Sequence, residues 1–194
     1  MDGLEDNGAA GEQEYAWLET YFVLISAADR PTLTQVEATL GETGGERWTI
    51  ENLRADDDGL FESLLVRAPD DNAALEVRYE SGEMVQEQAL ELASSLKEEL
   101  TPDQLAAMAA ADARLDVLHL EQVAAEGPGD GAGELGAASD DPFAAEVEAS
   151  DDEWGGPDMM GEGLDPGTLL MVVEALAKLT GGLPFDPAAG EVLV

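Results

Sequence analysis

The stretch Arg47–Glu83, RWTIENLRADDDGLFESLLVRAPDDNAALEVRYESGE, decides the fold of this chain. Apolar side chains alternate with polar ones at both of its ends, at Trp48, Ile50, Leu75, Val77 and Tyr79. Such alternation is typical of β-strands that bury one face. Two clusters rich in Asp, Gly, Pro and Asn, residues 56–59 and 68–72, interrupt the stretch and favour turns. We therefore predict three consecutive strands that form a meander.

The residues before the meander predict a buried strand and then a helix. Tyr21–Ala28 is short, apolar and rich in aromatic and β-branched residues, as in a strand buried on both sides. Thr32 and Gln35 have the spacing of a capping box at a helix start. Gly44 and Gly45 are expected to end this helix.

After the meander the apolar period lengthens to that of a helix. One stripe of a long helix is formed by Val85, Ala89, Leu92, Leu96 and Leu100. A second helix is predicted to start at Thr101, with Pro102 in its first turn and Gln104 as capping-box partner. Arg114–Val123 then predicts a further strand.

The last part of the chain, residues 164–194, predicts a closing helix and a short edge strand. Asp165 is the expected cap, Pro166 lies in the first turn, and Gly181 ends the helix. The apolar face of this helix is too broad to remain in water. It must therefore pack on the sheet, on another helix or on a second chain.

The order of these elements predicts an α+β fold with a mostly antiparallel sheet. The pattern is close to the split βαβ arrangement of ferredoxin-like folds, with helices packed on one face. Residues 15–123 are expected to form the core of the domain, and residues 164–194 to pack on it. Two acidic, glycine-rich segments, residues 1–14 and 124–163, are predicted to be a disordered tail and a disordered insertion.

The charge of the chain restricts its partners. It has 44 acidic and 8 basic residues, and its formal net charge is -36. Such a chain repels phosphate backbones and anionic lipid surfaces, so neither nucleic acid nor membrane is an expected partner. The acidity fits hydration in a salty cytoplasm, neutral drift of composition, or attraction to a basic partner. There is no cysteine, the start of the chain is unlike a signal peptide, and the apolar runs are short, so we predict a cytoplasmic protein.

The acidic turn of the meander is a weak candidate for a cation site, at Asp56, Asp57 and Asp58. An EF-hand loop with Gly59 in its sixth position would begin at Arg54 and end at Leu65, which does not supply its ligands. The residues on each side also alternate as strands do. A turn is the favoured interpretation.

His119 is the single histidine, and with Asp116 and Glu121 close in sequence it is a candidate general base. A place on a sheet face is the favoured alternative. No nucleophile elbow, phosphate loop or dinucleotide fingerprint is present, so the sequence predicts no cofactor and carries little indication of an enzyme.

The candidates for contact with a protein partner are apolar side chains in two segments. Trp154, Met159 and Met160 lie in the acidic insertion and are expected either to fold onto a partner or to pack on the chain's own core. The closing helix contributes Leu169, Val172, Val173 and Leu176.

Four segments, RPTLTQVEATL, DDDGLFESLLV, DARLDVLHLEQ and LDPGTLLMVVEALAKLTGG, resemble a family of uncharacterised bacterial proteins. The resemblance implies a bacterial protein of the cytoplasm with no assigned activity, and it transfers no site residue. Three functions are considered: a non-enzymatic interaction or regulatory module, which is favoured and includes a homodimer; an acidic binder or decoy of basic proteins; and an enzyme that uses His119.

Overall fold

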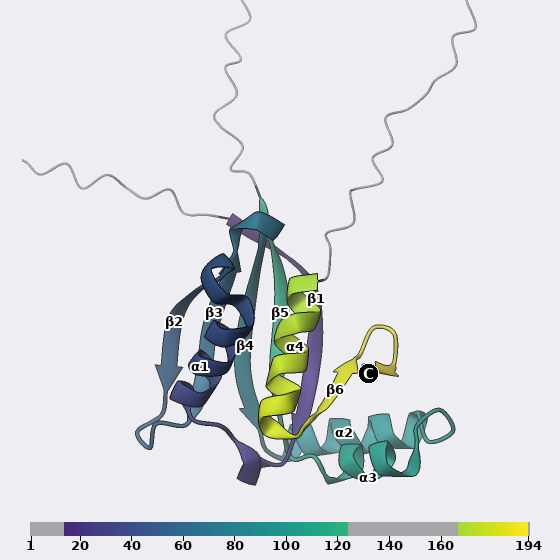
Figure 1. Ribbon diagram of the computed structural model, residues 1–194. Coiled ribbons are helices and arrows are strands. Elements are labelled where there is room, and N and C mark those ends of the chain that lie inside the picture. Colours follow the sequence, from purple (N-terminus) through teal and green to yellow (C-terminus); the bar gives the residue numbers. More distant parts are fainter. Residues whose placement is uncertain (1–13, 124–166, 194) are drawn as a thin grey trace, which may run out of the picture. The chain divides into compact units, whose positions relative to one another are not determined.

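The computed structural model describes residues 14–123 and 167–193 (Figure 1). The helices are α1 (Leu33–Gly44), α2 (Glu83–Ser95), α3 (Pro102–Ala110) and α4 (Gly167–Thr180). The strands are β1 (Glu14–Ile25), β2 (Thr49–Ala55), β3 (Phe61–Ala68), β4 (Ala73–Ser81), β5 (Ala113–Val123), β6 (Leu183–Asp186) and β7 (Glu191–Val192). The described residues belong to one compact unit of the chain.

The fold is α+β, with an open, antiparallel, seven-stranded sheet and four helices packed against it. The strand order is β2-β3-β4-β5-β1-β6-β7. The predicted meander is confirmed, because β2, β3 and β4 are neighbours in the sheet. Both predicted turns join these strands, and Asn72 takes the left-handed conformation (φ 50) that lets β4 begin.

Two of the predicted helix starts are confirmed as well, whereas the predicted cap of the closing helix, Asp165, lies outside the described residues. Thr32 and Thr101 each accept a hydrogen bond from the backbone N–H three residues later, and the glutamine at that position bonds back to the cap. Gly45 (φ 58) ends the helix α1 as expected. The helix α2 ends at Ser95, so Leu96 and Leu100 of the predicted stripe lie in the connection to α3.

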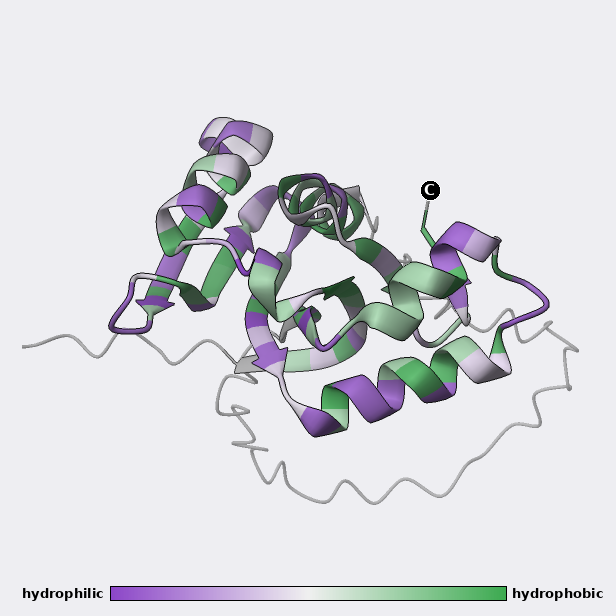
Figure 2. Cartoon of the chain, turned by 90° about the horizontal axis from the view of Figure 1, so that it is seen from below, coloured by the Kyte–Doolittle hydropathy of each residue, from purple (hydrophilic) through white to green (hydrophobic). Residues whose placement is uncertain are grey.

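The helices cover both faces of the sheet, which corrects the prediction that they pack on one face (Figure 2). On β1, Val23 and Ile25 contact the core beneath α1 and α4, whereas Phe22 and Leu24 belong to a second cluster with α2 and α3. A strand that is apolar at consecutive positions needs cover on both sides, and for this reason one layer of helices is insufficient.

We call the side that carries α1 and α4 the core face. Its rows follow from the strand register: His119, Leu75 and Val66 are neighbours, and so are Val117, Val77 and Leu64. The helix α4 packs beside α1 over these rows and buries Leu169, Val172, Val173 and Leu176. These four side chains are 0–1% exposed, so they form the hydrophobic core and are closed to a partner.

Among the residues that the structure describes, helices cover the opposite side of the sheet only near one end. There Ala89 and Ala93 of α2 and Met108 of α3 pack on Leu24 of β1 and Phe185 of β6. This cluster contains no residue from β2, β3 or β4. The remainder of this side carries no helix within the described part of the chain.

The first strand and the last strands of the described structure are longer or more numerous than predicted. β1 begins at Glu14 and not at Tyr21, because it pairs with β5 along its whole length. The last residues form a hairpin of two strands, β6 and β7, in which β6 pairs with β1. The tail before Glu14 and the insertion 124–163, with Trp154, Met159 and Met160, lie outside the described residues. In the part of the chain that is described, no helix is long and apolar enough to cross a bilayer.

Candidate protein-binding face

The uncovered side of the sheet presents two complete rows of side chains, which we call the open face. The first row is Trp17, Leu120, Ala74, Arg67 and Thr49, in the order β1, β5, β4, β3, β2. The second row is Thr20, Leu118, Glu76, Leu65 and Glu51, in the same order. These residues alternate along each strand with those of the core face.

The apolar part of the open face is centred on β5 and β1. Trp17 is 64% exposed, and its Nε1 donates a hydrogen bond to Thr20 Oγ1 at 3.0 Å, which holds the ring along the strand. Leu118, Leu120 and Leu65 are half-buried, with their outer surfaces toward solvent. An aromatic side chain held in place beside aliphatic neighbours is the kind of anchor found in protein interfaces.

Three of the protein's six arginines lie beside these apolar residues. Arg67 Nε lies 2.8 Å from Glu51 Oε2, and Arg78 binds both carboxylate oxygens of Glu76 at 2.7 Å. An open groove of about 630 Å³ runs along this side of the sheet and is lined by Arg54, Ser63, Leu65, Glu76, Arg78 and Leu120 among others. The open face therefore combines apolar area with guanidinium groups in a strongly acidic molecule.

His119 does not meet Asp116, one of the two carboxylates that the sequence predicted for it. It lies on the core face, 2% exposed, and its Nδ1 is 3.2 Å from Oε1 of Glu19 on the neighbouring strand. Asp116 lies on the opposite side of the sheet, where its Oδ1 is 2.6 Å from Nε of Arg114; the described side chains do not include Glu121. Burial raises the pKa of Asp116, and the Arg114 charge opposes this effect.

Tyr21 completes a small polar group next to His119. Its pKa is raised to about 12 by burial, by the charges of Glu19 and Asp186, and by hydrogen bonds to both carboxylates. The hydroxyl is thus held in its protonated form, which suits a structural donor better than a base. The imidazole is closed to solvent and gives a substrate no access to a general base.

The triple aspartate closes the turn between β2 and β3, as the favoured interpretation predicted. Asp56 Oδ1 accepts from the backbone N–H of Asp58 at 3.1 Å and of Leu60 at 2.9 Å, while Oδ2 lies 2.9 Å from Arg30 Nη1. These backbone bonds and the Arg30 charge lower the pKa of the Asp56 carboxyl. Asp57 and Asp58 are exposed, and the described residues contain no group of three or more possible ligands placed to hold a metal ion.

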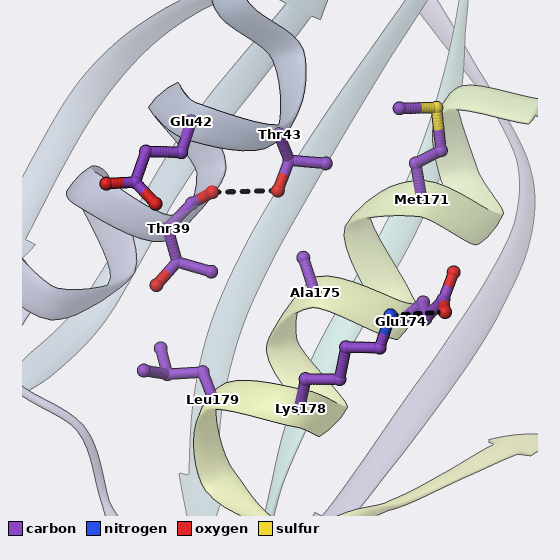
Figure 3. A pocket seen from close by; sticks show the side chains of 8 residues that line it. All are labelled: Thr39, Glu42, Thr43, Met171, Glu174, Ala175, Lys178 and Leu179. Carbon is purple, nitrogen blue, oxygen red and sulfur yellow. Dashed lines mark hydrogen bonds and ion pairs between the residues drawn. The ribbon is translucent and has the colours of Figure 1, made fainter.

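Two further hollows flank α4 on the other side of the molecule. One, of about 500 Å³, lies between α1 and α4 (Figure 3). In it Thr43 Oγ1 donates to the carbonyl oxygen of Thr39 at 2.8 Å, and Lys178 pairs with Glu174 at 2.6 Å. These groups satisfy one another, so this hollow has the character of a groove between two packed helices. The second, of about 760 Å³, lies between α4 and the β6–β7 hairpin.

Sequence reasoning missed the open face, because Trp17 stands before the first predicted strand. Alternation along the strand gives no signal for it, because the extra residue Leu18 places Trp17 on the other side of the sheet from Glu19 and Tyr21. A search of protein-family models, of curated proteins and of solved structures finds no match for this chain. The resemblance to bacterial proteins therefore stays a prediction.

Proposed function

We propose that this protein is a non-enzymatic interaction module that binds another protein through its open face. The observation that carries the proposal is the row of side chains from Trp17 to Arg67, which no described helix covers, on a seven-stranded sheet. Covering the exposed part of Trp17 alone contributes about 3 kcal/mol at ~25 cal/mol/Å², before the cost of association.

The test is quantitative co-purification with the full-length chain and two variants. Leu120→Glu places a negative charge in the middle of the open face. Met84→Glu introduces the same charge on α2, outside the open face, where Met84 is 73% exposed. We expect partners of the wild type to persist with Met84→Glu and to be lost with Leu120→Glu. Both variants are first checked for an unchanged melting temperature, and Trp17→Ala replaces Leu120→Glu if the latter unfolds.

Equal recovery of the same partners with both variants contradicts the proposal. A homodimer is the special case in which the partner is a second copy, and light scattering separates it from a heteromeric complex. If the protein is a strict monomer and no partner is recovered through the open face, neither the homodimer nor the heteromeric complex is supported.

A second candidate function is an acidic binder of basic proteins. It is favoured by the charge of α1 and α2, whose charged residues are all acidic: Glu37, Glu42, Glu83, Glu87 and Glu91. Binding of this kind collapses as salt rises and is insensitive to Leu120→Glu, whereas apolar contact on the open face survives moderate salt. The salt series therefore separates the two functions.

We also propose that the fold is a widened form of the ferredoxin-like pattern. Support comes from α1, which joins β1 and β2, two strands of the same direction that are separated by β5, β4 and β3. In a split βαβ unit the two joined strands likewise have other strands between them.

The proposed place of action, the bacterial cytoplasm, is tested by cell fractionation.

A further inference from the structure

The strand β1 has a backbone edge that the described sheet leaves unpaired. On one side it pairs with β5 from Glu14 to Ile25. On the other side β6 pairs only with Phe22, Val23 and Leu24. No other described strand pairs with residues 14–21 on that side, so within the described part of the chain a row of backbone N–H and C=O groups has no strand partner there.

Exposed apolar side chains stand beside this edge. Trp17 of the open face is 64% exposed, and the neighbouring Leu18 is 39% exposed. The register between β1 and β5 shifts between Trp17 and Glu19, so Leu18 is an extra residue in β1. A strand added at this edge would lie next to the indole ring of Trp17.

The charges along the same edge are negative. Glu19 has a side chain 38% exposed, and Tyr21 joins it to Asp186 of β6 through hydrogen bonds. The whole chain adds a net charge of -36, which attracts cationic groups over a long distance. A cationic side chain that faces Glu19 would therefore be favoured on this side of the strand.

We propose that the β1 edge binds an extended peptide segment as an additional strand, with an apolar residue over Trp17 and a lysine or arginine facing Glu19. Main-chain hydrogen bonds supply the contact, and the alternating side chains supply the selectivity. This inference rests on the proposed interaction function and specifies that the partner supplies an extended segment with apolar and cationic side chains. A second copy of the chain fits less well, because pairing two β1 edges would bring together two Glu19 side chains and two acidic molecules.

The test uses a peptide of alternating lysine and valine, with titration calorimetry and amide chemical shifts on the full-length protein. Two derivatives carry backbone N-methyl groups, one on the valines and the other on the lysines. Since alternate residues direct their N–H groups to the same edge of a strand, each derivative blocks one edge of the peptide. Their charge and side chains are otherwise the same.

We expect one methylated peptide to bind at least about tenfold more weakly than the parent, because it loses several hydrogen bonds to β1. The other should bind with nearly the parent affinity. Shifts should centre on residues 16–20, and Trp17→Ala should weaken the parent peptide about fivefold or more, whereas Met84→Ala should leave it unchanged.

Equal affinities of the two methylated peptides, whether both strong or both weak, overturn the inference. So does a set of shifts that avoids β1, or a dimer in light scattering that the peptide fails to dissociate. If the edge test fails but Leu120→Glu still abolishes co-purification, the interaction function stands without strand addition. If the co-purification fails and the edge test succeeds, only the proposed cellular function is lost.

Discussion

Asp56 shows how one carboxylate organises a turn, at the scale of the single residue. It is preceded by a strand, accepts two backbone hydrogen bonds, and pairs with Arg30, which also donates to the carbonyl oxygen of Phe61 at 2.9 Å. The type of residue was predictable from the turn, but the ion pair with Arg30 was not, because it joins positions far apart in sequence.

Replacement of Asp56 by alanine is expected to lower the melting temperature, and Asp56→Asn should lower it less because the amide oxygen still accepts the backbone bonds. The folded-state pKa of Asp56 lies below its ordinary value of 3.8. Its contribution is therefore complete above that value and disappears as the pH falls through the lower, folded-state value. Thermal melts of the three proteins at neutral and acidic pH measure this; equal melting temperatures would contradict it.

For Tyr21 we expect the opposite effect of pH: its contribution to stability is lost as the pH rises into the alkaline range. Its folded-state pKa of about 12 lies above the ordinary tyrosine value of 10.0, so the folded protein retains a proton that the unfolded chain loses. The stability from this group is present below pH 10.0 and declines as the pH rises to about 12. Tyrosinate absorbance should show a late step that Tyr21→Phe removes; a titration unchanged by that variant would be evidence against the assignment.

For a single helix, alanine substitutions at the two glycines of α1 distinguish the effect of helix propensity from the effect of packing. A Cβ at Gly44 would lie 2.1 Å from the Trp48 ring, whereas one at Gly41 would meet nothing within 4 Å. Gly44→Ala should therefore destabilise the fold by about 1–3 kcal/mol. Gly41→Ala should stabilise it by roughly 0.5–1 kcal/mol.

Urea unfolding of both glycine variants measures the two free energies of unfolding. Gly41→Ala is the matched control, since it adds the same methyl group to the same helix. Destabilisation of equal size at both positions would show that Trp48 does not pack against the end of α1.

Local pattern predicted most elements and the meander of β2, β3 and β4, but not the sheet neighbours of strands that are far apart in the sequence. The capping residues Thr32 and Thr101 depend on groups three residues away, and their helices start as expected. The place of β5 between β4 and β1 depends on pairing across the chain, which alternation does not encode. The expectation that Asp116 lies near His119 was wrong for a different reason: the two residues are three positions apart on one strand, so they point to opposite sides of the sheet.

The balance of charge sets the behaviour of the whole molecule. At a net charge of -36 the acidic groups repel one another, and mobile cations reduce this repulsion. The melting temperature should therefore rise as salt increases from a few millimolar to about 1 M. Calorimetric melts across this range provide the measurement, and a melting temperature that is flat or falls would show that self-repulsion is not a major term.

The proposed function requires that the open face around Trp17 contacts another protein in the cell. Photocrosslinking tests it most directly, with a photoreactive phenylalanine derivative placed in turn at positions 17, 65 and 84 of the full-length chain. We predict that positions 17 and 65 crosslink to the same protein and that position 84, on α2, does not. Adducts of equal yield at all three positions, or none at 17 and 65, would show that the open face does not bind the partner.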